Sequence, residues 1–467
     1  MALDSAFRDL TLRRARILRN LLSDPLPRDK ELVFEGYDYV YPEVAFHFTA
    51  MGRSYCTRMR LGAGVPQDAI DALPARTREI VFGVIGLALA PFHFLLSDFS
   101  AIRVRHPALP SGVLDFFSSF LPRGLGEFRY RQGLDPTRPI RVYGSTAGNE
   151  PARTRLLPTD RSILLLNGGG KDTAVMAEIL KATGLDCAWC SIGLGVHQKE
   201  IAAASGIDRS IVLGFRLDPA IRGHGRYPWG HIPHSSLYMS MALVPALALG
   251  YRYVTTGNEC SANFGNLRFM GEEINHQYTK SYEFELAFDS MVRTHIASDL
   301  QFFSALRPLH DLRIASMLST APAYFGKFVS CNIGPGWCCR CPKCAFTYLC
   351  LAAFLAPEDL QAIFGEDLFK RRDVRQHIRY LVEGTAKPWE CVGTQEESRA
   401  ALALVRRRFD ADWIRDLDRP DAMDQLAHIF RLHEPHNLPP ELRADMLRKA
   451  EEMTPRDLVP DSPEPCY

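Results

Sequence analysis

Hydrophobic and polar positions alternate along the first part of the chain, between residues 31 and 60. Aromatic and β-branched residues stand between turn-forming ones, as in the run Val44-Ala45-Phe46-His47-Phe48. A period of two is typical of half-buried strands, so this pattern predicts an antiparallel hairpin. The residues that follow predict helix up to about residue 96, a strand near 102–105 and a helix around 113–121.

Beyond residue 160 the pattern changes to short apolar runs that alternate with amphipathic stretches. The runs predict strands at 162–166, 187–192, 210–215 and 251–256, and the stretches predict helices at 174–183, 198–204 and 237–248. Such alternation favours a parallel sheet covered by helices on both faces. Ligands in that architecture gather at the carboxyl ends of the strands, where we expect Asn167 and Gly257.

A Pro- and Arg-rich segment at 136–160 predicts a linker or a long surface connection. We therefore predict three parts: an N-terminal α+β domain at 1–155, an α/β domain at 156–355, and a helical C-terminal extension at 356–467. The start, residues 1–20, predicts an amphipathic helix rather than a secretory signal. The tail at 455–467 is expected to be loose.

Composition excludes several classes of protein. The 467 residues carry 55 Lys and Arg against 54 Asp and Glu, so a formal charge of +1 provides no global attraction to nucleic acid or to an anionic membrane. The most apolar run, 81–96, contains Gly, Pro and His and is shorter than the roughly 20 residues of a membrane span. It predicts a buried helix or helix pair. Twelve cysteines without an export signal predict reduced thiols and a cytoplasmic protein.

The first chemical signal is a glycine-rich turn between a predicted strand and a predicted helix. Its members are Asn167, Gly168, Gly169, Gly170, Lys171, Asp172 and Thr173. Three consecutive glycines leave backbone N–H groups unshielded and the helix adds its positive end, so the turn suits a phosphate. Lys171 can add a charge, Thr173 a hydroxyl donor, and Asp172 can hold Mg²⁺ or cap the helix. The alternative is a turn that only lets strand and helix pack closely.

The turn is neither a Walker A sequence, because Asp follows Lys171, nor the dinucleotide pattern G-x-G-x-x-G. It resembles the pyrophosphate-binding loop of the PP-loop ATPases, S-G-G-x-D-S, with Gly168 at the first Ser and Thr173 at the second. That resemblance implies a PP-loop (HUP-like) parallel sheet flanked by helices, with ATP cut between its α and β phosphates. Because Gly168 replaces Ser, we expect Asn167 or the backbone to supply one phosphate contact.

Polar residues also gather in three stretches of the second half, at 257–263, 274–285 and 328–346. Together with the glycine turn and the run Lys387-Pro388-Trp389-Glu390-Cys391-Val392-Gly393, they resemble the UDP-N-acetylmuramoyl-L-alanyl-L-glutamate epimerase family, MurL. The most specific part is the run Asn-His-Gln-Tyr-Thr-Lys-Ser-Tyr-Glu-Phe-Glu, which begins at Asn275. In the first half, 35–37 and 124–128 fit the family. The segment 90–94 departs from it, which implies an altered preference if that segment touches the substrate.

The resemblance implies epimerisation of the terminal L-Glu of UDP-MurNAc-L-Ala-L-Glu to D-Glu, with ATP converted to AMP and diphosphate in the presence of Mg²⁺. An α-proton beside a free carboxylate is hard to remove, because the carbanion would lie next to an existing negative charge. Adenylation cancels that charge and makes the carbonyl an electron sink. The expected partner is therefore this UDP-MurNAc-dipeptide, with no nucleic acid and no membrane.

Candidates for proton transfer come from the family-matching stretches: Glu259, Cys260, His276, Lys280, Glu283 and Glu285. The predicted catalytic set comprises Lys171, Asp172, Glu259, His276, Lys280 and Glu283. If residues 276–283 are helical, His276 and Lys280 share a face and Glu283 can pair with Lys280. A surface ion-pair network is the alternative for the charged members of this set.

Four cysteines form the pattern C-x₆-C-x₂-C-x₂-C: Cys331, Cys338, Cys341 and Cys344. Thiolates at these spacings on a Gly- and Pro-containing turn can close a tetrahedral zinc site. The arrangement is also similar to the zinc knuckle of the 7-cyano-7-deazaguanine synthases, another PP-loop family. An iron–sulfur cluster held by three of the cysteines and reduced cysteines without metal are the alternatives.

Two other functions remain open from the sequence. One is a different PP-loop adenylating enzyme that forms an amide or nitrile or thiolates tRNA, although the chain shows no basic stripe for tRNA. The other is a non-catalytic, zinc-stabilised protein that binds a nucleotide without turning it over.

Overall fold

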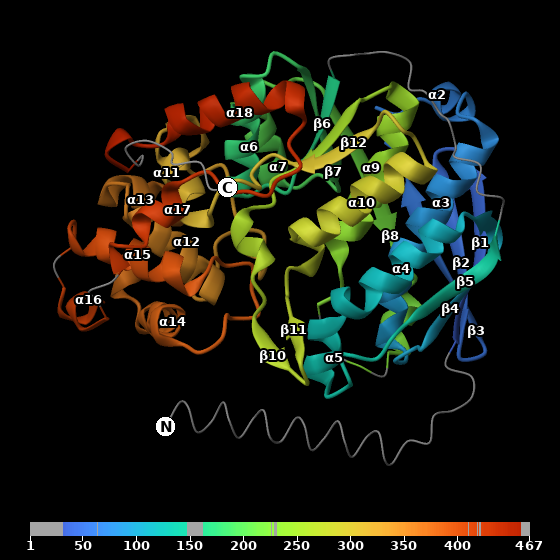
Figure 1. The fold of residues 1–467 in the computed structure, drawn as a ribbon, viewed down its shortest axis with the longest axis horizontal. Helices are drawn as coiled ribbons and strands as arrows, with labels where there is room; N and C mark the ends of the chain where they lie inside the picture. Colours follow the sequence, from blue (N-terminus) through green and yellow to red (C-terminus); the bar gives the residue numbers. More distant parts are fainter. Residues whose placement is uncertain are drawn as a thin grey trace.

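The computed structural model describes residues 31–62, 64–146, 162–225, 227, 231–409, 411–417, 419 and 422–458. The helix predicted at 1–20 lies outside these residues, as does most of the tail predicted to be loose. Strands β1 to β5 stand at one end of the molecule and the C-terminal helices gather at the other end (Figure 1).

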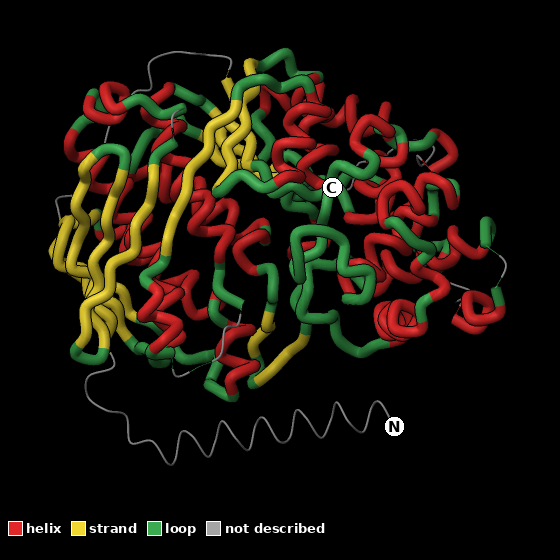
Figure 2. Tube along the Cα trace, turned by 180° about the vertical axis from the view of Figure 1, so that it is seen from behind, coloured by secondary structure: helices red, strands yellow, loops and turns green. Residues whose placement is uncertain are grey.

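Ten strands of the described chain form one large sheet, which Figure 2 shows from behind. Its order is β12-β9-β6-β7-β8-β3-β2-β1-β4-β5. The strands are β1 (Glu31–Val40), β2 (Glu43–Ala50), β3 (Arg53–Arg60), β4 (Ala101–Leu109), β5 (Arg141–Thr146), β6 (Ser162–Leu166), β7 (Asp186–Ile192), β8 (Ser210–Arg216), β9 (Tyr253–Thr256) and β12 (Gln301–Ser304). A separate two-stranded sheet pairs β10 (Leu267–Phe269) with β11 (Glu272–Ile274).

Helices of the described chain cover this sheet and form the C-terminal part. They are α2 (Gln67–Asp71), α3 (Ala75–Leu89), α4 (Ser111–Gly124), α5 (Gly126–Gln132), α6 (Lys171–Lys181), α7 (Val196–Ser205), α8 (Pro219–Gly223), α9 (His234–Leu249), α10 (Tyr282–His295), α11 (Asp311–Ser319), α12 (Pro342–Ala352), α13 (Pro357–Phe364), α14 (Arg372–Glu383), α15 (Gln395–Arg406), α16 (Asp412–Leu417), α17 (Leu426–Phe430) and α18 (Pro440–Met453). An α/β fold with a helical C-terminal part is thereby confirmed.

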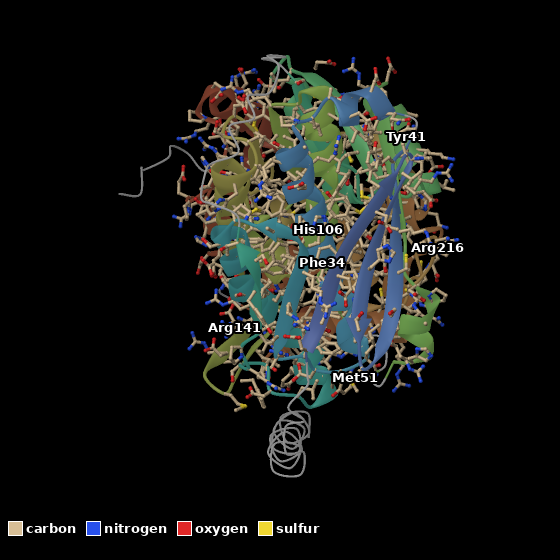
Figure 3. The ribbon with its side chains drawn as sticks, turned by 90° about the vertical axis from the view of Figure 1, so that its right-hand side faces the viewer. Phe34, Tyr41, Met51, His106, Arg141 and Arg216 are labelled. Atoms are coloured by element: carbon tan, nitrogen blue, oxygen red, sulfur yellow. The ribbon has the colours of Figure 1, made fainter. Side chains whose placement is uncertain are left out.

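The alternation at the start of the chain is confirmed as strand, but it forms three antiparallel strands rather than one hairpin. Phe34, Phe46 and Phe48 are buried on one face, and the ring centroids of Phe34 and Phe48 lie 5.1 Å apart. Figure 3 looks onto these strands from outside, with Tyr41 and Met51 at their opposite ends. Polar residues at the intervening positions leave the other face towards solvent.

Strand β3 joins the N-terminal strands to the rest of the sheet through antiparallel pairing with β8, where Met59 faces Phe215. The sheet therefore continues across the boundary predicted near residue 155, and the division at 155 and 355 stays a prediction. The prediction of a linker at 136–160 is wrong in its first part, because β5 lies there and pairs in parallel with β4. Ile140 and Val142 are buried, so few apolar residues suffice for this edge strand.

The strands β6, β7, β8, β9 and β12 are all parallel, as the alternation of strands and helices predicts. The chain adds β7 and β8 on one side of β6 and then β9 and β12 on the other side, so the strand order reverses between β6 and β9. Ligands in open α/β sheets bind outside the carboxyl ends of the strands at this reversal. Asn167 directly follows β6 and Gly257 directly follows β9, so both lie at the expected edge.

Two apolar cores cover the two faces of the parallel strands. Leu164 of β6 packs into one core, whereas its neighbours Ile163 and Leu165 pack into the other, because successive side chains of a strand point to opposite faces. Helices α3, α4, α9 and α10 contribute to the first core, and helices α6, α11, α12 and α15 contribute to the second. The parallel sheet is therefore buried on both sides.

Helix α3 continues into the 3-10 helix Ala90–Leu95, and together they form a long apolar helix, Ala75–Leu95. The combined segment has 21 residues and a mean hydropathy of 1.5, which suffice by length and composition to cross a membrane. However, 89% of its most apolar window is buried inside the protein. The prediction of a buried helix pair at 81–96 is confirmed, and the family-divergent segment 90–94 lies in this core.

Candidate functional site

A cavity of about 430 Å³ opens at the carboxyl ends of β6 and β9, where the order of the parallel strands reverses. The glycine turn, the ends of β7 and β9 and the first turns of α9 line one part of it. The segments that contain Lys280, Ser330 and Cys391 line another part. Residues predicted from separate motifs therefore meet in one cavity, as a ligand site requires.

Asn167 closes the glycine turn on itself. Its side-chain oxygen accepts a hydrogen bond from Gly169 N at 3.0 Å, and its amide nitrogen donates to the carbonyl of Gln198 at 3.0 Å. Gly169 has a φ of 75°, in the left-handed region that favours glycine. Within the described chain, the N–H groups of Gly168 and Gly170 have no hydrogen-bond partner. The backbone, rather than the Asn167 side chain, is therefore open to an anion.

Lys171 points into the protein rather than into the cavity. Its ammonium group forms ion pairs with Asp172 and Asp311, and 4% of its side chain is exposed. Burial alone would lower the pKa of Lys171, but these carboxylates and Glu259 overcome burial and raise it. Burial raises the pKa of Asp311 to about 7 against the opposing effect of Lys171. Lys171 thus ties the start of α6 to the start of α11, while Asp172 stays at the cavity wall.

Lys280 and Lys343 bring positive charge to the cavity wall. The nearby Cys391 sulfur is the largest cause of the raised pKa of Lys280, followed by burial, which opposes it, and by Glu259, which adds to it. Lys280 is therefore firmly cationic. Two ammonium groups beside unpaired N–H groups form an arrangement suited to a polyphosphate.

A buried ion pair between Arg307 and Glu285 fixes the backbone behind this wall. The Nε atom of Arg307 lies 2.9 Å from Oε2 of Glu285, and neither side chain is more than 1% exposed. The same guanidinium donates to the carbonyl of Glu259 at 2.7 Å and to the carbonyl of Lys280 at 2.6 Å. Glu285 thereby positions two of the predicted catalytic residues through Arg307 and does not itself reach the cavity.

Glu259 lies behind the cavity wall, with 4% of the residue exposed. Burial and the neighbouring Asp172 raise the pKa of its carboxyl group, whereas Lys280 and Lys171 lower it. Glu259 is not among the residues that line the cavity in the described chain. It balances the charge of Lys171 and Lys280 from the second layer.

His276 and Lys280 both lie near Cys391, but they do not stand on the α-helix that would have given them a shared face. Residues 278–280 form one turn of 3-10 helix, and α10 begins only afterwards. The Nδ1 atom of His276 hydrogen-bonds to the carboxylate of Glu127, and the Nζ atom of Lys280 lies 3.6 Å from the Sγ atom of Cys391. Burial would lower the pKa of His276, but hydrogen bonds to Cys391 and Glu127 raise it to about 9.

Glu283 lies apart from the other predicted catalytic residues. Its side chain is 64% exposed and forms an ion pair with Arg123. It lines a separate hollow together with Arg123 and Tyr278. The predicted pairing with Lys280 is not formed among the described residues, so the structure does not bring Glu283 into the cavity.

The four cysteines of the predicted metal site converge. The Sγ atoms of Cys331 and Cys341 lie 3.9 Å apart, those of Cys338 and Cys344 lie 3.7 Å apart, and all four fall within 4.8 Å of one another. A tetrahedron with Zn–S bonds of about 2.3 Å has edges of about 3.8 Å. The donor set therefore fits Zn²⁺. The fifth cysteine, Cys339, turns away and donates to backbone carbonyls.

Four residues around the cavity are absent from the predicted set: Glu127, Arg307, Asp311 and Cys391. Glu127 and Cys391 fall in segments that carried the family resemblance without an assigned role. Arg307 and Asp311 stand in the run from Ala305 to Leu312, in which the other residues except His310 are apolar. An isolated charge in an apolar run is costly to bury without a partner, so this signal could have identified both.

Comparison with known proteins shows which family has this sequence. The model of the MurL N-terminal domain matches residues 36–305, and the model of the MurL C-terminal domain matches residues 327–423. Together they span the glycine turn, the 274–285 stretch, the cysteine cluster and Cys391. No solved structure matches the chain significantly.

Three curated relatives share one name, UDP-N-acetyl-alpha-D-muramoyl-L-alanyl-L-glutamate epimerase. The protein of Xanthomonas oryzae pv. oryzae is 34% identical over 68% of this chain and 75% of its own length. That of Micromonospora sp. is 30% identical over 81% of this chain and 88% of its own length. That of Salinispora tropica is 31% identical over 74% and 76%, respectively. Since one family model alone covers more than half of the chain, the chain belongs to the MurL family of epimerases.

Proposed function

We propose that this epimerase converts the terminal L-Glu of UDP-MurNAc-L-Ala-L-Glu to D-Glu in peptidoglycan precursor synthesis, through an acyl-adenylate formed from ATP. The shared name of the three relatives supports the substrate. One observation carries the use of ATP: unpaired N–H groups of the glycine turn share a cavity with Lys280 and Lys343.

The phosphates of ATP would bind where the glycine turn meets the N-terminus of α6. Gly168 and Gly170 offer N–H groups there, and the helix dipole adds partial positive charge. Lys280 and Lys343 would neutralise the phosphate oxygens from the opposite segments of the lining. Asp172 is the carboxylate on the wall that would hold Mg²⁺, whose role is to balance phosphate charge.

Adenylation makes the epimerisation possible. An oxygen of the glutamate α-carboxylate attacks the α-phosphorus of ATP, and diphosphate leaves. The mixed anhydride has lost the carboxylate charge, so the electron pair of the broken Cα–H bond can move into its carbonyl. A proton returned to the opposite face inverts the centre, and attack of water on the carbonyl releases AMP and the product.

We further propose a structural zinc ion held by Cys331, Cys338, Cys341 and Cys344. Four thiolates leave no open coordination position, so the ion would supply stability rather than Lewis acidity. The ion would fix the segment before it against the glycine turn, where Ser330 Oγ accepts from Lys171 N at 3.3 Å. The expectations of a cytoplasmic protein without nucleic-acid or membrane partners stay predictions.

The test is turnover of UDP-MurNAc-L-Ala-L-Glu with ATP and Mg²⁺ in deuterated water. We expect diphosphate release, D-Glu at the peptide terminus and deuterium at its α-carbon. UDP-MurNAc-L-Ala, which lacks the glutamate, is the matched control and should release no diphosphate. Diphosphate release without deuterium would indicate another PP-loop adenylation, and nucleotide binding without any release would indicate a non-catalytic protein.

A further inference from the structure

Cys391 occupies a position in the cavity wall that no predicted role explains. It lines the cavity beside Lys280, whose Nζ atom donates to its Sγ atom at 3.6 Å. His276 lies behind the wall, close enough to the same sulfur to lower the pKa of the thiol, and Glu127 hydrogen-bonds to Nδ1 of that imidazole. The four side chains form a relay from a buried carboxylate through an imidazole to a thiol at the cavity, with an ammonium beside it.

The rear of this relay is fixed by burial and by charge. The Glu127 side chain is 1% exposed, and its second oxygen lies 3.1 Å from an Arg131 nitrogen. The ring of His231 packs on the ring of His276 with centroids 4.2 Å apart. A carboxylate on Nδ1 fixes the tautomer and orientation of a histidine and supports the protonated ring. His276 therefore presents its remaining N–H to the sulfur.

The loop that carries Cys391 is held on both sides. The amide nitrogen of Asn266 donates to the carbonyl of Pro388 at 2.7 Å, and the amide nitrogen of Gln277 contacts the carbonyl of Val392 at 3.5 Å. On the other side, Asn332 donates to the Glu390 carboxylate at 3.1 Å. These contacts fix the sulfur relative to the stretch that carries His276 and Lys280, which is the preorganisation that proton transfer needs.

Charge distinguishes Cys391 from Cys190, which also lines the cavity. Burial raises the pKa of both sulfurs, and for Cys190 burial acts alone and raises the pKa to about 12. At Cys391 the positive charges of Lys280, Lys343 and His276 overcome burial and hold the pKa well below its ordinary value. The pKa values of Cys190 and Cys391 are thus shifted in opposite directions, because only Cys391 has cationic neighbours.

We propose, resting on the proposed function, that the Cys391 thiolate is one of the two proton-transfer groups at the glutamate α-carbon, with His276 and Glu127 as its positioning residues. Cys391 is a better candidate than Glu259 or His276 because it lines the cavity and they lie behind it. Lys280 stabilises the thiolate and, from the same wall, the negative charge that develops on the carbonyl oxygen.

Every proton in the proposed epimerisation step is accounted for. In the L to D direction the sulfur takes the α-proton, so the Cα–H bond breaks, an S–H bond forms and the electron pair moves into the adenylate carbonyl. A water molecule on the opposite face then gives a proton to the α-carbon. The hydroxide that remains takes the thiol proton through solvent, which restores the thiolate and the water. No oxidant or reductant takes part.

The experiment separates adenylation from proton transfer in the full-length protein. Diphosphate release, D-Glu formation and α-deuterium are measured in parallel for the wild type, Cys391→Ala and Cys391→Ser. Because an acid or base contributes about 10²- to 10⁴-fold, we expect both variants to lose D-Glu and α-deuterium at least about 100-fold. Their substrate-dependent diphosphate release should fall by less than about tenfold. Cys56→Ser, on β3 away from the cavity lining, is the matched control and should resemble the wild type.

Each outcome decides the proposal. Epimerisation by Cys391→Ala at near wild-type rate would overturn it, as would a hydroxylamine-sensitive substrate adduct on Cys391, which would make the sulfur a nucleophile. A wild type that shows none of the three signals contradicts the proposed function instead. Alkylation of the wild type with iodoacetamide, mapped by mass spectrometry, needs no folded variant: loss of epimerisation must follow modification of Cys391, and modification of another cysteine as the cause would overturn the proposal.

The positioning roles of His276 and Glu127 are tested by the pH profile of epimerisation. His276→Gln keeps a polar side chain but cannot carry charge, and Glu127→Gln removes the charge that supports the imidazolium. We expect both variants to shift the pH profile of epimerisation to the alkaline side while diphosphate release keeps its wild-type profile. A uniform loss of both activities without a change in profile would contradict the positioning roles.

Discussion

Lys171 at the first position of α6 and Asp311 at the first position of α11 form an ion pair in the interior of the protein. Their side chains are 4% and 6% exposed. The lysine of the glycine turn therefore neutralises buried carboxylates rather than a ligand in the cavity. Positive charge for a ligand comes instead from Lys280 and Lys343, which line the cavity.

Removing the Lys171 charge should destabilise the fold. Lys171→Met leaves Asp311 buried and unpaired, and breaking a buried pair in this way costs about 3–5 kcal/mol. The double variant Lys171→Met/Asp311→Asn should recover a large part of this loss, because it removes the uncompensated charge. Urea unfolding measures both effects. Lys370→Ala, at a lysine whose side chain is 83% exposed, should leave the midpoint nearly unchanged, and additive losses in the double variant would contradict the coupling.

Lys280 and Glu283 are three residues apart in the most specific family stretch, yet the structure gives them opposite roles. We expect Lys280→Met to lower epimerisation at least about 100-fold, because it removes charge from the developing oxyanion and from the Cys391 thiolate. Glu283→Gln should stay within about twofold of the wild type, because it breaks only an exposed pair with Arg123. Steady-state kinetics of the two variants checks this, and a loss of activity in Glu283→Gln as large as that in Lys280→Met would contradict the assignment.

Local patterns predicted most of the fold but not the contacts of the site. The strand predicted at 162–166 matches β6 at both ends, because the apolar run stops at Leu166 and the polar Asn167 and three glycines follow it. Glu283 and Glu285 were not distinguishable in sequence. On α10 they lie about 200° apart, so one faces Arg307 and the other faces solvent.

Long-range contacts explain what the sequence could not supply. His276 meets Glu127 across 149 residues, and Lys280 meets Cys391 across 111 residues. Hydrophobic periodicity and turn chemistry describe only neighbours within a few residues. The family resemblance covered both partner segments, but a resemblance without contacts assigns no role to a glutamate or a cysteine. The contacts among Glu127, His276, Lys280 and Cys391 therefore follow from the three-dimensional structure and not from the sequence pattern.

Removal of the proposed zinc should weaken nucleotide binding as well as the fold. Cys331 follows Ser330, which contacts the glycine turn, so loss of the metal frees this support. We expect about one zinc per chain by elemental analysis, and lower thermal stability and ATP affinity after chelation, both restored by Zn²⁺. Cys344→Ser should lose the metal, whereas Cys339→Ser should retain it. The proposal would be contradicted if the purified wild type contained neither zinc nor iron and if adding Zn²⁺ did not change its ATP affinity.

The reactivity of Cys391 should depend on pH in a direction set by its neighbours. Its pKa is lowered, so the thiolate is present above that lowered value and disappears only as the pH falls through it. As the pH falls from about 8 to about 6.5, the rate of Cys391 modification by iodoacetamide should therefore fall much less than that of a thiol with an ordinary or raised pKa. The rate at Cys56, whose pKa burial raises, should fall about tenfold per pH unit over the same range. Mass mapping of each cysteine gives both rates, and His276→Gln should move Cys391 towards the behaviour of Cys56.

Two glycines of the glycine turn should respond in opposite ways to an added side chain. A Cβ at Gly168 would lie 3.7 Å from the Thr173 hydroxyl, which is an ordinary contact, whereas a Cβ at Gly170 would lie 3.1 Å from the Ser330 hydroxyl. Gly168→Ser should therefore keep the wild-type unfolding midpoint and bind ATP at least as tightly, since it adds a hydroxyl donor where the PP-loop ATPases have one. Gly170→Ala should displace Ser330, which accepts from Lys171 N, and weaken ATP binding about tenfold, or about 1.4 kcal/mol. Calorimetric titration with ATP compares the two variants directly, and weaker binding by Gly168→Ser than by Gly170→Ala would show that ATP does not lie against this turn.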